Sequence, residues 1–394
     1  MDVALPAVVT ASLAATGAVT PAPTTQPGVW SLTPGTKIGA VAVGEHVLRI
    51  QPKIDVRRVI FLLGYALNPR GWQHDDVPLA HADDLLSAVA QAYALQVERA
   101  LRPGVLHGYR TRDDALTVLR GRMRSTDQLQ RRFALPLPLE VRYSEFTADT
   151  TENRTLKAAA LRLLEMPVLP PATRGALRRV AFSWLADVAA VPARGLGKWH
   201  PSRLNSRYQP ALALADIVLA GQSFEHARGP LPVTGFLLDM ATLFEDFVTV
   251  ALRHALTRHG GAVRPQYRTY FDQACAVPAR PDLVWLHGNT PAAVVDAKWK
   301  AETAGGRVPN ADLYQMLAYC TVLSLPRGHL VYARGNEAPA EHQVRNSHAR
   351  ITCHAVDLEQ EPAALLAQIR ELADELASVD VDAQPARSGR LVVL

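Results

Sequence analysis

Residues 292–299 form an apolar strand pattern that carries two opposite charges on one face. Side chains alternate across a strand, so Val294, Asp296 and Lys298 are expected on the same side. The opposite side is wholly apolar, with Ala293, Val295, Ala297 and Trp299. Such a strand fits a sheet that has one face packed against a helix and a polar site on the other.

The preceding segment repeats this division. In Arg280-Pro281-Asp282 and the strand that follows, Pro281, Leu283 and Trp285 share one face, while Arg280 and Asp282 project to the other. Residues 287–291 read His-Gly-Asn-Thr-Pro, a turn sequence that joins the two strands. An antiparallel pair built in this way brings Asp282 close to Asp296.

The elements around this pair predict an α/β fold with a mixed central sheet. Apolar periodicity predicts helices at 237–258, 309–323 and 360–378 and strands at 263–271, 280–286, 292–299, 328–333 and 350–356. We therefore expect a C-terminal α/β domain over residues 230–380, with a broad boundary before it at 195–230.

The N-terminal half predicts a different arrangement. Strands around a turn at Gly44-Glu45 are expected within 37–54, and helices are expected at 56–67, 82–101, 152–166 and 172–190. We interpret residues 31–200 as an α+β domain followed by a helical middle region. Residues 1–30 are rich in Ala, Thr and Pro, so they are expected to form a flexible or partly ordered leader.

Charge is unevenly distributed along the 394 residues. Residues 1–200 hold 24 Lys and Arg against 17 Asp and Glu, a net of +7, and the rest has 18 against 20, a net of −2. Eight arginines gather between positions 102 and 132. This basic half suits an acidic partner such as nucleic acid, although a solvated arginine-rich surface explains it equally well.

Several classes of protein are disfavoured. The three cysteines are far apart, which argues against a disulfide framework and fits a reducing cytoplasm. No apolar run approaches the roughly 18 residues of a membrane span. The chain has no G-x-x-x-x-G-K-[ST] phosphate loop, so we do not expect it to hydrolyse GTP or ATP itself.

Asp282 and Asp296 form a candidate metal site. Two close carboxylates repel, and a divalent cation removes that penalty. Their hard oxygen atoms suit Mg²⁺, with Mn²⁺ as a substitute, and such a metal activates bound water and stabilises phosphoryl charge. Lys298 would orient or deprotonate that water. The alternative interpretation of Asp296 and Lys298 is a salt-bridged pair at a sheet edge.

Three further residues are candidates for the same site. Glu245 borders the apolar stripe of helix 237–258, so it is either an added acid or a solvated carboxylate. Gln315 and Tyr319 are four residues apart and therefore neighbours on helix 309–323. They either hydrogen-bond phosphate oxygens or form an ordinary polar helix flank.

These motifs resemble those of a known family. The R-P-D and D-A-K motifs and Tyr314–Tyr319 (YQMLAY) resemble the PD-(D/E)XK nuclease core of McrC, the endonuclease subunit of McrBC-type 5-methylcytosine-dependent restriction systems. Other segments with this resemblance are Gln51–Ile54, Arg120–Arg122, Val141–Thr150, Asn153-Arg154 with Lys157, and Leu243–Phe247. The resemblance covers roughly residues 37–360.

The resemblance implies a role in antiviral defence. McrC-like subunits bind a ring of AAA+ GTPase subunits through the N-terminal domain, stimulate GTP hydrolysis and cut DNA, whereas the ring recognises the methylated DNA. Carried over residue by residue, Asp282 and Asp296 would hold Mg²⁺ and Lys298 would be the catalytic lysine. Glu245, Gln315 and Tyr319 are weaker correspondences.

Two other functions stay open at this point. The chain is either a nuclease of the same fold from another repair or defence system, or a non-enzymatic adaptor whose nuclease fold only docks DNA or a partner. The complete D…D-x-K motif argues against the adaptor. A neighbouring AAA+ GTPase gene would favour the restriction subunit over the other nucleases.

Overall fold

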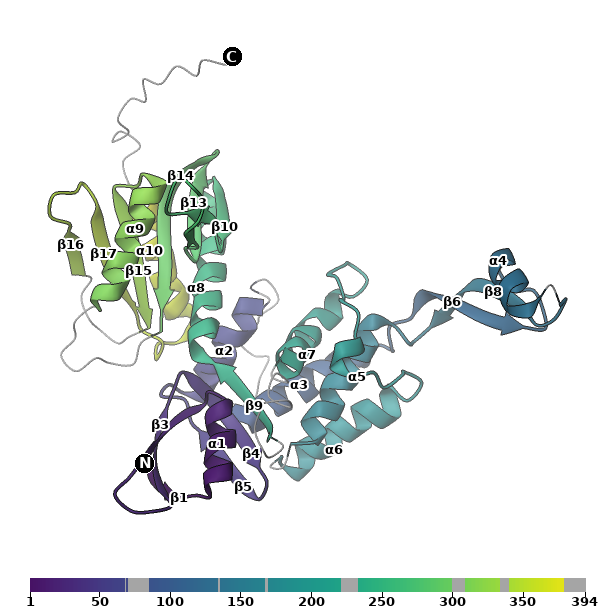
Figure 1. Ribbon diagram of the computed structural model, residues 1–394. Helices are drawn as coiled ribbons and strands as arrows, with labels where there is room; N and C mark the ends of the chain where they lie inside the picture. Colours follow the sequence, from purple (N-terminus) through teal and green to yellow (C-terminus); the bar gives the residue numbers. More distant parts are fainter. Residues whose placement is uncertain are drawn as a thin grey trace, which may run out of the picture. The chain divides into compact units, whose positions relative to one another are not determined.

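The computed structural model describes residues 1–67, 69, 85–133, 135–166, 169–220, 233–299, 309–333 and 340–378 (Figure 1). The chain divides into two compact units. Unit 1 comprises Met1–Val56 and Gly71–Leu238, and unit 2 comprises Arg57–Arg70 and Asp239–Leu394. The polar tail and the LVVL end at 383–394 lie outside the described residues.

The first 34 residues are folded, which corrects the expectation of a leader over 1–30. They form β1 (Asp2–Ala4), α1 (Ala7–Ala15), β2 (Val19–Pro23) and β3 (Val29–Pro34), with the strands in the order β1-β3-β2. Val9 and Leu13, four residues apart in α1, are buried in one cluster with Leu32 and Val41. The content of Ala, Thr and Pro suggested a flexible segment, but the few large apolar residues have a common core.

A second sheet of unit 1 joins segments that are far apart in the sequence. The predicted hairpin forms β4 (Lys37–Val43) and β5 (His46–Ile50), and β9 (Val233–Asp239) adds to it in the order β5-β4-β9. Gly39 has φ +128°, and a Cβ atom there would lie 2.2 Å from the carbonyl oxygen of Phe236. The glycine therefore permits the close approach of β4 and β9. β9 occupies the start of what was predicted as a helix from 237.

The helical part of unit 1 contains α3 (Leu85–Leu101), α5 (Thr151–Leu164), α6 (Pro171–Arg179), which continues as a π-helical turn at Val180–Trp184, and α7 (Gln209–Ala220). Helix α7 lies inside the segment expected to be a boundary. Two polar residues fix α5 to its neighbours. Asn153 donates from Nδ2 to the carbonyl oxygens of Leu106 and Ala148, and buried Lys157 donates to that of Val188 at 2.7 Å. The Asn153 and Lys157 motif therefore organises the fold.

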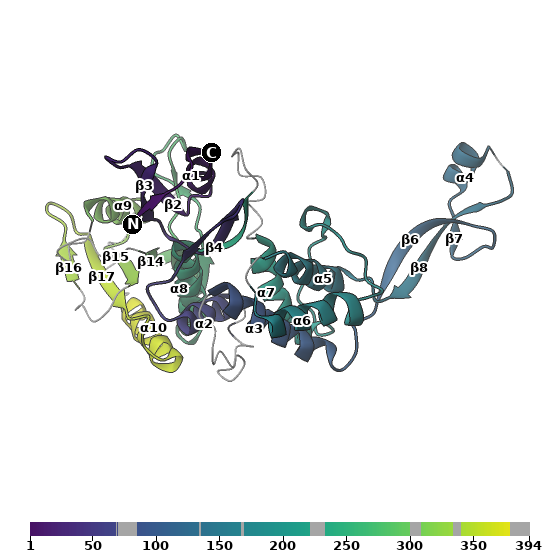
Figure 2. The same cartoon turned by 90° about the horizontal axis from the view of Figure 1, so that it is seen from below.

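The arginine-rich segment forms a projecting arm. Its elements are β6 (Gly108–Leu116), β7 (Arg122–Met123), α4 (Ser125–Arg132) and β8 (Leu139–Thr147), with the strands in the order β6-β8-β7. Figures 1 and 2 show the β6-β8 ribbon extending away from α5, α6 and α7, with α4 at its far end. We predicted none of these strands because arginines and acids occupy so many of their positions that the usual alternation of apolar and polar residues is not visible.

Many charges of the arm are paired within it. Arg142 contacts Asp113, Arg132 contacts Glu140 at 3.0 Å, and Arg124 contacts Asp127. At the base, Asp149 accepts from Arg110 of β6 and Arg154 of α5. Part of the positive charge of the arm is therefore neutralised locally by neighbouring acids.

Unit 2 contains the expected mixed sheet. Its six strands are β10 (Ala262–Pro265), β13 (Leu283–His287), β14 (Thr290–Lys298), β15 (Arg327–Ala333), β16 (Ala340–Gln343) and β17 (Arg350–Val356). The order is β10-β13-β14-β15-β17-β16, with β14, β15 and β17 parallel and the other pairs antiparallel. The predicted strand 263–271 is interrupted. Its second part is β11 (Thr269–Tyr270), which pairs with β12 (Pro278–Ala279).

Helices cover both faces of this sheet (Figure 1). Helix α9 (Asn310–Leu323) packs on the face that carries Val294 and Leu330, while α8 (Met240–Leu256) and α10 (Pro362–Ala377) pack against β14, β17 and each other. Helix α2 (Val56–Leu67) also belongs here, although we assigned it to the N-terminal region. The Phe61 and Phe247 rings lie 5.9 Å apart edge to face, which attaches α2 to α8.

Candidate active site

Strand pairing brings Asp282 and Asp296 together as predicted. Leu283 at the start of β13 is the register partner of Val295 in β14. Because the two strands are antiparallel, Asp282, just before Leu283, adjoins Asp296, just after Val295. Oδ2 of Asp282 accepts a hydrogen bond of 2.8 Å from the backbone N–H of Ala297. The Asp282 carboxylate is therefore held in place by the backbone of the residue that lies between Asp296 and Lys298.

Lys298 forms an ion pair with Asp296. Its Nζ lies 2.5 Å from Oδ2 of Asp296, whose side chain is 3% exposed, whereas that of Lys298 is 22% exposed. The ammonium thus lies at the solvent side of a buried carboxylate. The predicted apolar face behind them is present, since Val295 and Ala297 are buried and the Trp299 ring contacts that of Phe244 in α8 at 6.0 Å.

Glu245 of α8 reaches the site through a residue that we did not predict. Gln266, just after β10, donates from Nε2 to Oε1 of Glu245 and, at 3.3 Å, to Oδ1 of Asp282. Its backbone N–H also donates to the carbonyl oxygen of Asp282 at 2.7 Å. Glu245 is therefore part of the acidic cluster rather than a solvated helix carboxylate. No sequence motif marks Gln266, because its role depends on the pairing of β10 with β13.

Burial makes the negative charge of the cluster costly. It raises the pKa of Asp282 to about 6, with Glu245 adding repulsion, and raises that of Asp296 to about 6, with Asp282 adding repulsion. The pKa of Glu245 is also raised, chiefly by burial. For Lys298, burial lowers the pKa, but the attraction and hydrogen bond to Asp296, with added attraction to Asp282 and Asp312, together outweigh it and the net shift is upward. The site therefore holds three acids against one lysine.

Gln315 and Tyr319 lie on the α9 side of the site. Gln315 donates from Nε2 to the Tyr319 hydroxyl at 2.8 Å. Tyr319 is buried, and its pKa is raised by burial and then by the negative charge of Asp296. Tyr319 is thus close enough to Asp296 to sense its charge, and Gln315 orients the tyrosine hydroxyl.

The residues present fit a small divalent cation. Asp282, Asp296 and Glu245 offer hard carboxylate oxygens, which Mg²⁺ and Mn²⁺ prefer. A donor, Nε2 of Gln266, already lies between two of the carboxylates. The space between the Glu245 and Asp282 carboxylates therefore favours a positively charged group. Asp282 and Asp296 are the candidate ligands.

The family model named McrBC 5-methylcytosine restriction system component matches residues 32–333. The chain belongs to this McrBC family. Within it the chain has the features of McrC, the nuclease component of the system. The matched region includes the arm of unit 1 and the D…D-x-K motif of unit 2, which confirms the resemblance inferred from the sequence.

A solved structure shares this McrC-like fold. A chain of the Thermococcus gammatolerans assembly of McrB AAA+ hexamers with bound McrC is 18% identical, with 91% of this chain and 86% of that chain covered and a TM-score of 0.58. A chain of the Thermococcus gammatolerans McrBC complex is 19% identical, with 58% and 68% covered and a TM-score of 0.40. No curated protein matches the chain. None of the helices described is both long and apolar enough to cross a membrane.

Proposed function

We propose that this chain is the DNA-cleaving subunit of a 5-methylcytosine-dependent restriction complex. One observation carries the proposal. Asp282, Asp296 and Lys298 meet at the junction of β13 and β14, with the two acids adjoining and the lysine ion-paired to one of them. This arrangement suits hydrolysis of a phosphodiester bond, in which a cation and an ammonium neutralise developing charge.

In this mechanism Asp282 and Asp296 would hold Mg²⁺, with Glu245 beside them in the acidic cluster. When bound, Mg²⁺ would supply an activated water and neutralise charge at the phosphate. Lys298 lies at the exposed edge of the cluster, where its ammonium orients the attacking water and approaches a phosphate oxygen. The Tyr319 hydroxyl accepts a hydrogen bond from Gln315 and would be able to donate its own proton to the substrate.

We further propose that unit 1 binds a ring of AAA+ GTPase subunits and stimulates their GTPase. Support comes from the arm, where large apolar side chains are exposed at the far end. Phe133 is 86% exposed, and Leu129, Leu135 and Leu137 are also exposed. An apolar surface of this kind is typical of a protein interface. The similar Thermococcus gammatolerans chain comes from an assembly of McrB AAA+ hexamers with bound McrC.

A cleavage assay tests the catalytic proposal. The chain is purified with its AAA+ partner and given methylated plasmid, GTP and Mg²⁺, and wild type is compared with Lys298→Ala and with the exposed control Lys198→Ala. Cutting should be lost in the first variant and kept in the second. Cutting by neither wild type nor variants, in a complex that hydrolyses GTP, would favour the adaptor.

A nuclease from another DNA-processing system is the second candidate. The same D…D-x-K geometry supports it, because that geometry by itself does not select a partner. Metal-dependent cutting of unmethylated DNA without any AAA+ partner would favour this second function.

A further inference from the structure

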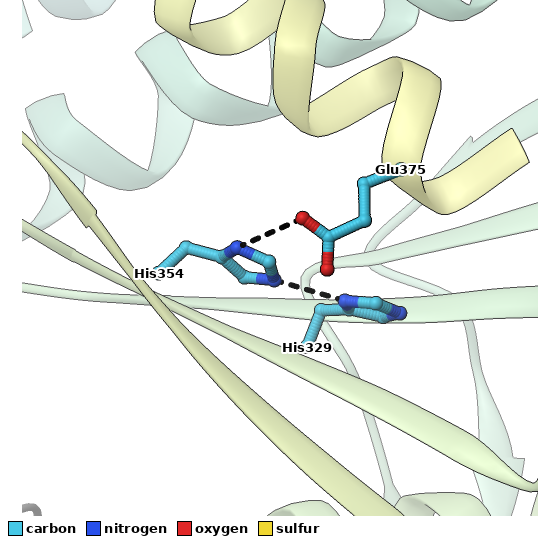
Figure 3. Close-up of side chains that lie close together, drawn as sticks. All are labelled: His329, His354 and Glu375. Atoms are coloured by element: carbon cyan, nitrogen blue, oxygen red, sulfur yellow. Dashed lines mark hydrogen bonds and ion pairs between the residues drawn. The ribbon is translucent and has the colours of Figure 1, made fainter. Parts of the chain in front are cut away.

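A second cluster of potential metal ligands lies in unit 2, away from the acidic cluster. It comprises His329 of β15, His354 of β17 and Glu375 of α10 (Figure 3). One ligand atom of each residue lies within 4.8 Å of those of the other two. Leu330 is the register partner of Asp296, so its neighbour His329 points to the opposite face of the sheet. The two clusters are therefore on different sides of the sheet.

The two imidazoles face each other at hydrogen-bonding distance. Nδ1 of His329 lies 3.0 Å from Nε2 of His354, and Nδ1 of His354 lies 3.7 Å from Oε2 of Glu375. Figure 3 shows the Glu375 carboxylate turned toward both rings. Two nitrogens and one carboxylate oxygen thus converge from three separate elements, as the ligands of a metal site do.

Burial leaves this group incompletely satisfied. His329 is fully buried, and its Nε2 has no hydrogen-bond partner among the described residues. Nε2 is not the nitrogen that faces His354, so a cation bound between the two rings would leave it unpartnered. Burial lowers the pKa of His329 to about 3 and that of His354 to about 4, so both rings are neutral at physiological pH and able to bind a cation.

We propose that His329, His354 and Glu375 bind a borderline divalent cation, with Zn²⁺ as the expected metal. Imidazole nitrogen suits Zn²⁺, whereas Mg²⁺ prefers oxygen, so the site should be selective against the ion of the acidic cluster. Three protein ligands leave a fourth position for water. The Glu375 side chain is 45% exposed, so it opens that position to solvent.

The ligation would replace the hydrogen bond between the two imidazoles. With Nδ1 of His329 and Nε2 of His354 on the metal, the remaining protons sit on Nε2 and Nδ1 respectively. Arg327 is a cation near this group. Its charge adds to burial in lowering the pKa of His329, and it partly offsets the burial that raises the pKa of Glu375.

A metal here would link α10 to the central strands. His329 is the register partner of Val295, the residue just before Asp296, and His354 lies on the neighbouring strand β17. Occupancy would therefore stabilise the back of the sheet whose front carries the acidic cluster. This role does not depend on the proposed nuclease activity.

Metal content tests the site directly. Full-length protein carrying Asp282→Asn and Asp296→Asn, so that the acidic cluster is disabled, is stripped with chelator and titrated with Zn²⁺ by calorimetry. It should bind one equivalent. His354→Gln and Glu375→Gln should each lower the affinity at least tenfold, while the exposed control His348→Gln should leave it unchanged.

Co²⁺ gives a second readout, because its visible absorption reports ligand number and geometry. The starting protein should show tetrahedral Co²⁺ bands that Glu375→Gln weakens. Glu375 is partly exposed, so this variant should fold, as circular dichroism would verify. Zn²⁺ binding that is absent, or that persists in both His354→Gln and Glu375→Gln, would overturn the proposal.

Discussion

Asp282 accepts a hydrogen bond through Oδ2 from the backbone N–H of Ala297, the residue between Asp296 and Lys298. The bond joins the two motifs of the active site across the β13-β14 pair. It also means that Asp282 has a structural partner, whereas the Asp296 carboxylate is held in an ion pair with Lys298. Substitutions at the two acids should therefore differ in their effect on the fold.

Asp296→Asn should stabilise the metal-free protein at neutral pH. The pKa of Asp296 is raised from 3.8 to about 6, so the folded state binds this proton more tightly than the unfolded state. The contribution of Asp296 to the free energy of unfolding is therefore fully present below pH 4 and is lost as pH rises to about 6. Removing the charge should add about 1–3 kcal/mol above pH 6, measured by urea unfolding with chelator.

Asp272→Asn is the matched control. Asp272 accepts from the backbone N–H groups of Ala276 and Val277, and its pKa is lowered, so its charge is favoured in the fold. This variant should lose stability at neutral pH. A gain for Asp296→Asn that is equally large at pH 4 and pH 8 would contradict the assigned cause.

Mg²⁺ or Mn²⁺ should be required for cutting, and Ca²⁺ should bind without supporting it. The pKa of Asp282 and that of Asp296 are both raised to about 6, so protons compete with metal for these ligands. Apparent Mg²⁺ affinity should therefore fall as pH drops from 8 to 5, as calorimetry would show. Full cleavage in excess EDTA, or affinity that is constant over this range, would refute the metal assignment.

The active site was more predictable than the rest of the fold. Asp282, Asp296 and Lys298 stand out because strand alternation places charges in an otherwise apolar pattern. Gln266 could not be found, since its position depends on strand pairing between distant segments. The leader over 1–30 was misjudged because burial of Val9 and Leu13 depends on strands later in the chain. Local periodicity identifies elements, but it does not identify their partners.

DNA binding by the isolated chain should be weak and salt-dependent. Each phosphate contact releases counterions, so affinity falls with salt in proportion to the number of contacts. Because Arg110, Arg124 and Arg132 are already paired with acids, we expect a slope below that of eight independent arginines between positions 102 and 132. Fluorescence anisotropy between 50 and 200 mM salt, concentrations typical for this test, measures it. Affinity that does not change over this range would contradict the prediction.

Leu129→Ser in the arm should weaken binding to the AAA+ ring without destabilising the chain. The Leu129 side chain is 62% exposed in α4, so its loss should change the free energy of unfolding by less than ~0.5 kcal/mol. Ring assembly and GTPase stimulation are followed on the same sample. Val8→Ser in unit 1 removes another exposed apolar residue and is the control. Equal effects of both variants would argue against the arm as the interface.

Lys298→Ala should separate DNA cutting from GTPase stimulation. Lys298 lies at the edge of the site with its side chain partly exposed, and the packing of β14 comes from Val294, Val295 and Ala297. Its loss should therefore cost little packing energy. It does leave the buried Asp296 carboxylate without its cation, so a moderate loss of stability, about 1–2 kcal/mol, is expected at neutral pH. This loss should shrink when Mg²⁺ is bound.

The two activities are then measured on one mutant complex. GTP hydrolysis should continue near the wild-type rate because the proposed partner surface is in unit 1, whereas Lys298 is in unit 2. Plasmid cleavage should fall by at least 100-fold, as expected for loss of a group that stabilises charge in the transition state. Cutting near the wild-type rate would remove Lys298 from the catalytic mechanism. Loss of both activities in a folded mutant would instead contradict the division of function between the units.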